Sequence, residues 1–111
     1  MALELLSSVM QEEFPLTQQS LGIARDLLHR QIPADSTNAD SQSKEFIGGA
    51  LPSGANLWSK AGWTDEVRHD VAWVKLPEGK NLGLAIFTAG FGENLHLIAE
   101  MTSSLLNLLS K

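Results

Sequence analysis

The residues of this sequence that could do chemistry gather between Leu57 and Thr88. Lys60 stands two residues before Gly62, at the end of one apolar run and ahead of a second run that begins at Val67. A lysine and a glycine spaced in this way, at a strand end ahead of a hairpin, form a motif in their own right. The alternative interpretation is a solvated strand lysine followed by a glycine bulge.

Other kinds of chemistry are disfavoured by residue type and spacing. The chain has no cysteine, which excludes disulfides, thiolate nucleophiles and zinc–thiolate sites. His29, His69 and His96 fall in separate predicted elements without ligand spacing, so we expect no metal site and no cofactor. His69 and Asp70 are neighbours on a predicted strand and point to opposite faces, so they form no dyad with each other.

The elements that position these residues can be predicted from apolar spacing. We expect helices over 2–12 and from the N-cap Thr17 to Gln31, because apolar residues recur there at intervals of three and four. The polar segment 34–45 is predicted to be a flexible loop, and 46–51 a single helical turn that returns the chain to the body.

Three strands and a last helix follow. We predict strands over 57–64, 67–74 and 82–88, with a turn at Pro77–Lys80 between the last two and a final helix capped by Asn94. The predicted fold class is α+β, a three-stranded antiparallel sheet with helices before and after it, in a single domain over 1–111.

The composition disfavours several classes of binding partner. The net charge is −5, which argues against nucleic acid or an anionic membrane as the main partner. No apolar run approaches the roughly 20 residues that span a bilayer. Glu4 stands where a secretory signal would carry basic residues, so we expect no signal peptide.

The segment Trp58-Ser59-Lys60-Ala61-Gly62-Trp63-Thr64 resembles the C-terminal part of serine β-lactamase-like hydrolases of the class A and penicillin-binding type. Lys60-Ala61-Gly62 matches their K-T-G signature, with alanine in place of threonine or serine. The context agrees: Leu51-Pro52-Ser53-Gly54 precedes the motif, and Asp70-Val71-Ala72-Trp73-Val74 follows it. The resemblance extends over nearly the whole chain.

This resemblance implies roles for particular residues. Lys60 would bind a substrate carboxylate, and the Trp63 amide would be one of two oxyanion-hole donors. Ala61, Gly62 and Thr64 would line the substrate, with Gly62 keeping the strand backbone accessible. Arg68 could reach the same anion from the next strand, or be a solvated charge. Ala61 lacks the hydroxyl that would contact the carboxylate, which puts β-lactam hydrolysis in doubt.

The resemblance also implies missing parts. The family's serine and S-x-N motifs lie upstream in a helical region, and the family is usually periplasmic or extracellular. Ser41-Gln42-Ser43-Lys44 fits S-x-x-K and Ser36-Thr37-Asn38 fits S-x-N, but their order and polar context do not suit catalysis. We therefore expect a fragment that is inactive alone, with a small-molecule substrate only in the complete protein.

The alternative function is a non-catalytic α+β interaction module. In the family the last strand pairs with a strand from the start of the full protein, so 82–88 could here expose an apolar edge. Such a chain would form a homodimer through that edge, or the edge would be covered by the missing N-terminal portion or by the chain's own first helices.

Overall fold

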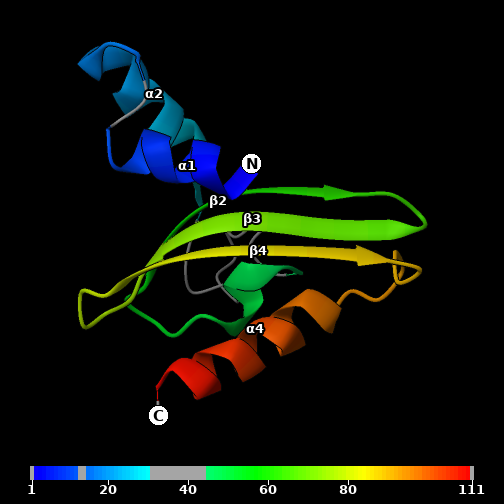
Figure 1. Cartoon of the computed structure of the whole chain (residues 1–111). Helices are drawn as coiled ribbons and strands as arrows, with labels where there is room; N and C mark the ends of the chain where they lie inside the picture. Colours follow the sequence, from blue (N-terminus) through cyan, green and yellow to red (C-terminus); the bar gives the residue numbers. More distant parts are fainter. Residues whose placement is uncertain (1, 13–14, 31–44, 111) are drawn as a thin grey trace.

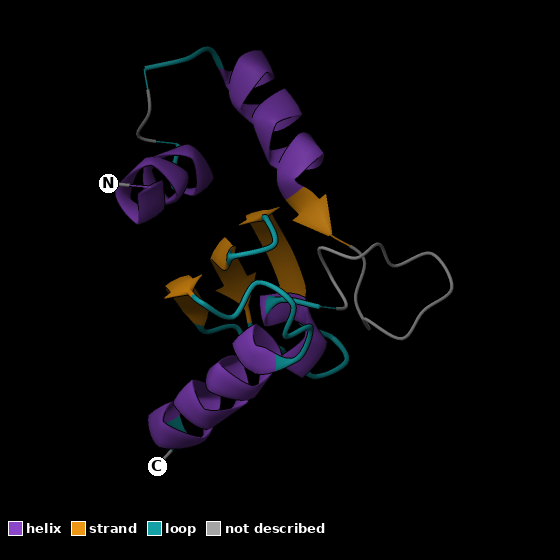
Figure 2. Cartoon of the chain, turned by 90° about the vertical axis from the view of Figure 1, so that its right-hand side faces the viewer, coloured by secondary structure: helices purple, strands orange, loops and turns teal. Residues whose placement is uncertain are grey.

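The computed structural model describes residues 2–12, 15–30 and 45–110. It has the layered α+β architecture that the sequence predicts, with helices on both faces of an antiparallel sheet (Figure 1). Helices α1 (Ala2–Met10) and α2 (Gln18–Leu28) lie on one side of the sheet. The short 3-10 helix η1 (Ile47–Ala50) and helix α4 (Leu97–Leu109) lie on the other side. Figure 2 shows these layers from the end of the sheet.

The described residues form a four-stranded sheet in the order β1-β2-β3-β4. The long strands are β2 (Asn56–Trp63), β3 (Val67–Lys75) and β4 (Asn81–Ala89), which follow one another as two hairpins. The predicted turn at Pro77–Lys80 is confirmed, because the Leu76 amide donates to the Lys80 carbonyl over 2.8 Å. Gly79 adopts φ +95° within this turn, a conformation that favours glycine.

The prediction of three strands was wrong, because a short strand β1 (His29–Arg30) pairs antiparallel with β2. The apolar spacing of the second helix continues to Gln31, but α2 ends at Leu28 and His29 is extended, with φ −66° and ψ 136°. The His29 amide still donates to carbonyls of the last helical turn, while the backbone of His29 and Arg30 pairs with Trp58 and Leu57 of β2. Tertiary contact thus overrides local helix periodicity.

The other boundaries agree closely with the sequence. Thr17 caps α2, since its hydroxyl oxygen accepts a hydrogen bond from the Ser20 amide at 3.1 Å. The helical turn expected within 46–51 is η1. Asn94 does not cap α4 directly: its side chain accepts from the amide of His96, and the helix begins at Leu97. The predicted flexible loop 34–45 lies outside the described residues up to position 44.

The core lies between the sheet and the layer of η1 and α4. Alternate residues of β3 are buried toward this layer, as expected for a strand with one covered face. The cluster consists of Phe46, Ile47, Leu51, Ala55, Leu57, Ala61, Ala72, Val74, Ile86 and Ile98. We call this side of the sheet the core face, and the side toward α1 and α2 the outer face. Successive side chains of a strand point to opposite faces. The position of a residue along its strand therefore decides whether its side chain lies on the core face or the outer face.

Candidate functional site

The predicted motif lies on a strand edge that is open in the described part of the chain. Strand β1 pairs with β2 only at Leu57 and Trp58, so no described strand borders Lys60–Trp63 on that side. On the other side the same segment pairs fully with β3, up to Trp63 opposite Arg68. An open edge offers backbone amides and carbonyls to an extended ligand.

The register of the hairpin directs the Trp63 amide toward this open edge. The Thr64 amide donates to the Val67 carbonyl at 2.9 Å, which makes 64 and 67 a hydrogen-bonded pair. Hydrogen-bonded and non-hydrogen-bonded pairs alternate along an antiparallel ladder. Trp63 and Arg68 therefore form a non-hydrogen-bonded pair, and the Trp63 N–H points away from β3. That is the orientation an oxyanion-hole donor needs.

Lys60 reaches the same edge from the outer face. Its side chain is exposed, and its Nζ donates a hydrogen bond of 2.6 Å to the carbonyl of Ala61, the next residue along the edge. The stem of Lys60 also lines an apolar groove of about 350 Å³ between α1 and the sheet. The groove walls include Leu5, Val9 and Val71. A cationic head thus stands beside the edge, at the end of an apolar surface.

The remaining motif residues differ in what they offer. A methyl group built on Gly62 would meet only His69 Cδ2, at 3.9 Å, so packing within the described chain does not require glycine. Ala61 is 4% exposed and faces the core. The Thr64 hydroxyl oxygen accepts from the amides of Glu66 and Val67, at 3.1 and 3.2 Å, and so is used within the hairpin.

Arg68 is not brought together with Lys60. It lies on the core face, 3% exposed, whereas Lys60 faces the outer side. Its guanidinium pairs with Glu45 at 3.1 Å, donates to the Gly92 carbonyl at 3.2 Å and stacks 4.4 Å from the centre of the Phe46 ring. These contacts join the segments before η1 and α4 to the sheet.

Asp70 is a chemically unusual residue whose environment sequence reasoning missed. It is fully buried on the core face, where Oδ2 accepts a hydrogen bond of 3.0 Å from the Ile47 amide. Oδ1 is also buried and has no hydrogen-bond partner among the described residues. Burial raises the pKa of Asp70 from 3.8 to about 7, against the opposing effects of the Ile47 amide and of Arg30 and Lys60. The sequence does contain a signal for this burial: Asp70 occupies one of the alternate positions of an apolar strand whose side chains face the core.

Three further expectations concern other parts of the chain. The formal serine motifs at Ser36–Asn38 and Ser41–Lys44 lie outside the described residues. Within 2–12, 15–30 and 45–110, no three histidine or acidic side chains gather in a way that could hold a metal ion. The helices of the described segments include none long and apolar enough to cross a membrane.

The fold agrees with the comparisons to known proteins. The model of the β-lactamase enzyme family matches residues 16–109, so this chain belongs to that family. A comparison with curated protein sequences finds no match.

Solved structures share the fold at low sequence identity. They include a variant of the TLA-1 extended-spectrum β-lactamase, with TM-score 0.75, 22% identity and coverage of 98% of this chain and 40% of that one. The structure of PBP-A has TM-score 0.72 and 18% identity, and the match covers 96% of this chain and 37% of that one. The chromosome-encoded β-lactamase of Vibrio parahaemolyticus has TM-score 0.73 and 17% identity, covering 98% and 40%. The chain spans about 40% of the length of these structures.

Proposed function

We propose that this chain is the substrate-binding sheet of a β-lactamase-like serine hydrolase and that it performs no hydrolysis by itself. The observation that carries the proposal is the open edge of β2, where the Lys60 ammonium and the outward Trp63 amide lie within four residues of each other. The family match and the partial coverage of the solved structures support it.

In the proposed reaction, the complete protein transfers an acyl group from an amide or ester to a serine and then hydrolyses the acyl-enzyme. Lys60 binds the substrate carboxylate, and the Trp63 N–H donates to the oxyanion of the tetrahedral intermediate. The serine and the second oxyanion donor belong to a helical portion that packs on the outer face. The apolar groove beside Lys60 is part of the surface that such a portion would cover.

The substrate-binding role predicted for Arg68 is replaced in this proposal by a positioning role. Its three polar and ring contacts hold Glu45, Phe46 and Gly92 against the core face, on the far side of the sheet from Lys60. A buried guanidinium with these partners would lose them if it turned toward the edge. Lys60 is therefore the principal anion-binding side chain, with Gly62 leaving room for substrate.

The test is acylation and binding of benzylpenicillin by the chain as given. Intact-protein mass after incubation should show no covalent adduct, because neither formal serine motif has the order and context that activate a nucleophile. Amide chemical shifts should nevertheless change at Gly62 and Trp63, and Lys60→Met should abolish that change. A matched control, Lys75→Met, removes an exposed lysine from the far end of the sheet and should leave the shifts intact.

Two results would contradict the proposal. A covalent adduct on the isolated chain would show that it contains its own nucleophile, and peptide mapping would then decide whether Ser41 carries it. Equal shift changes in the parent chain and in Lys60→Met would show that the lysine does not bind the carboxylate.

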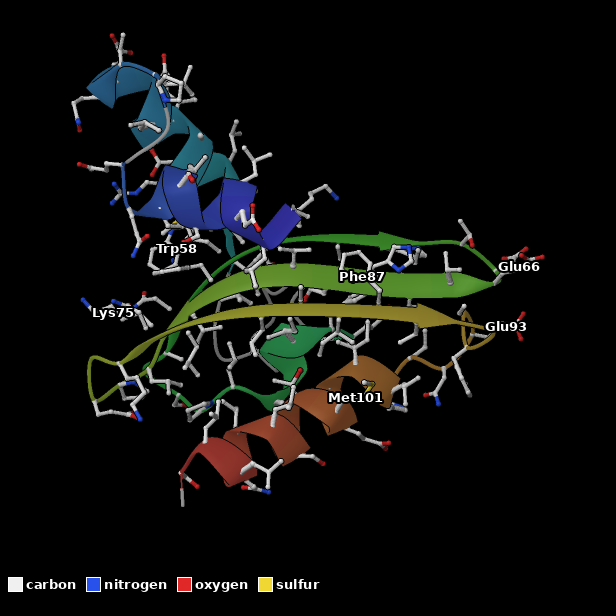
Figure 3. The ribbon with its side chains drawn as sticks, viewed as in Figure 1. Trp58, Glu66, Lys75, Phe87, Glu93 and Met101 are labelled. Carbon is white, nitrogen blue, oxygen red and sulfur yellow. The ribbon has the colours of Figure 1, made fainter. Side chains whose placement is uncertain are left out.

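A second candidate function rests on β4, which is an edge strand of the described sheet. Its residues 82–88 carry no charge, and Phe87 is 63% exposed on the outer face (Figure 3). Long uncharged edges promote strand pairing between chains. In this interpretation the chain is an interaction module that dimerises through β4. Ala85→Lys should then convert a dimer to a monomer in sedimentation, while Ser104→Lys on α4 should not; a monomer at high concentration counts against it.

A further inference from the structure

A second cavity lies between α2 and the sheet. Its volume is about 440 Å³, and its walls come from Glu12 just after α1, one side of α2, and the paired strands β1 and β2. The residues that line the cavity include Glu12, Gly22, Arg25, Asp26, His29 and Trp58. Figure 3 shows Trp58 on the side of the sheet that α1 and α2 cover. The edge proposed to bind the hydrolase substrate contributes none of these residues.

Two residues of this cavity are unfavourable for the helix that carries them. Gly22 stands in the interior of α2, where glycine is a poor helix former, and a methyl group built there would meet no described residue within 4 Å. Asp26 stands in the last turn, where the helix dipole disfavours an acid. Packing among the described residues explains neither Gly22 nor Asp26. Positions where a sequence goes against local preference are expected at functional sites.

The charges of the cavity favour a cation. Arg25 is paired with Glu12 at 2.7 Å, so these two charges offset each other. Asp26 has no ion pair or side-chain hydrogen bond within the described segments, and its carboxylate lies near the carbonyl end of α2. The His29 ring meets the Trp58 indole edge to face, with centroids 5.4 Å apart. An aromatic pair beside an unpaired carboxylate is the arrangement that binds organic ammonium groups.

We propose that this cavity is a binding site for a small organic cation with a methylated ammonium head. Gly22 leaves the space that the head occupies, Asp26 supplies the opposite charge, and Trp58 with His29 supplies an aromatic wall. The site is independent of the proposed hydrolase function. The source of the head, a free molecule or a group on a larger one, does not alter the chemistry.

The first experiment titrates choline into the isotope-labelled full chain and follows the indole N–H signals of its tryptophans. The Trp58 signal should shift in a saturable way, with a dissociation constant on the order of 1–10 mM, since the contacts are one aromatic wall and one exposed carboxylate. Trp63 and Trp73 serve as internal controls and should not move. The uncharged analogue 3,3-dimethyl-1-butanol has the same shape and should bind at least about tenfold more weakly.

Two variants then separate binding from folding. Asp26→Asn should weaken choline binding about tenfold, and Asp65→Asn, an exposed aspartate at the β2–β3 turn, should leave it unchanged. Gly22→Ala should weaken binding while raising the midpoint of thermal unfolding by about 4 °C. Because both substitutions in α2 favour the helix, lost binding would not come from unfolding.

The proposal is overturned by any of three results. These are no saturable shift of Trp58 with choline, equal shifts with choline and its uncharged analogue, and unchanged affinity in Asp26→Asn. Choline and penicillin titrations report on different residues, so failure of one leaves the other proposal standing.

Discussion

The buried carboxyl of Asp70 should make the stability of this protein fall as the pH rises from about 4 to 7. The perturbation that isolates it is Asp70→Asn, which keeps the shape of the side chain. The asparagine oxygen can still accept the Ile47 amide, now 3.0 Å from Oδ2. Its amino group would replace Oδ1, which is buried and has no hydrogen-bond partner in the described segments.

The sign follows from the raised pKa. Below pH 3.8 the carboxyl is protonated in the folded and unfolded chain, so its ionisation costs nothing. Between 3.8 and about 7 the unfolded chain has lost the proton and the folded chain still holds it, so the free energy of unfolding falls as pH rises. Above about pH 7 the carboxyl is ionised in both states, so its contribution to the free energy of unfolding no longer changes with pH.

The magnitude follows from the same pKa shift. Each unit is worth about 1.4 kcal/mol. The full window therefore corresponds to about 4 kcal/mol, of which about 2–3 kcal/mol falls between pH 5 and pH 8. The asparagine variant lacks this dependence. Its buried amino group adds a cost of about 1–3 kcal/mol that does not vary with pH. The pH dependence therefore isolates the carboxyl.

The assay is urea unfolding of both proteins at pH 5 and pH 8, read by tryptophan fluorescence. Other titrating groups contribute equally to both proteins, so they cancel in the difference between them. Relative to the parent chain, the free energy of unfolding of Asp70→Asn should rise by about 2–3 kcal/mol on going from pH 5 to pH 8. A difference that stays within about 0.5 kcal/mol across this range would refute the reasoning.

Three other substitutions test the packing. Gly92→Ala should destabilise the chain by more than about 2 kcal/mol in urea unfolding, because the added methyl group would overlap the backbone of Asp65; unchanged stability would mean that this contact is not close. Arg68→Met should cost about 2 kcal/mol, since it removes the ion pair and the Gly92 hydrogen bond, and added salt should not reproduce the loss. Ile98→Ala should cost about 2–5 kcal/mol because its side chain is fully buried, whereas Leu108→Ala, 64% exposed, should cost little; equal costs would contradict the described core.

Local patterns in the sequence were enough to predict most of the elements and the family. Alternation of apolar residues indicates the long strands, Pro77–Lys80 indicates their turn, and Thr17 indicates a helix start. These features depend on residues a few positions apart in the chain, and the type of each residue determines its local backbone preference. The lysine motif at Lys60 was also visible, through its spacing to Gly62 and its place before a hairpin. The resemblance it carried is confirmed by the family match.

Other features depend on strand register and on contacts between distant segments, so they are specified only by the tertiary structure. Strand β1 exists because His29 and Arg30 meet β2 nearly thirty residues later. Arg68 and Lys60 separate to opposite faces because the Thr64–Val67 turn sets the pairing, and one step of register exchanges the faces of a strand. The pKa of Asp70 is raised because η1, from a distant part of the chain, buries it. Residue type alone does not specify burial or which face a charge occupies, since both arise only when separate segments pack together.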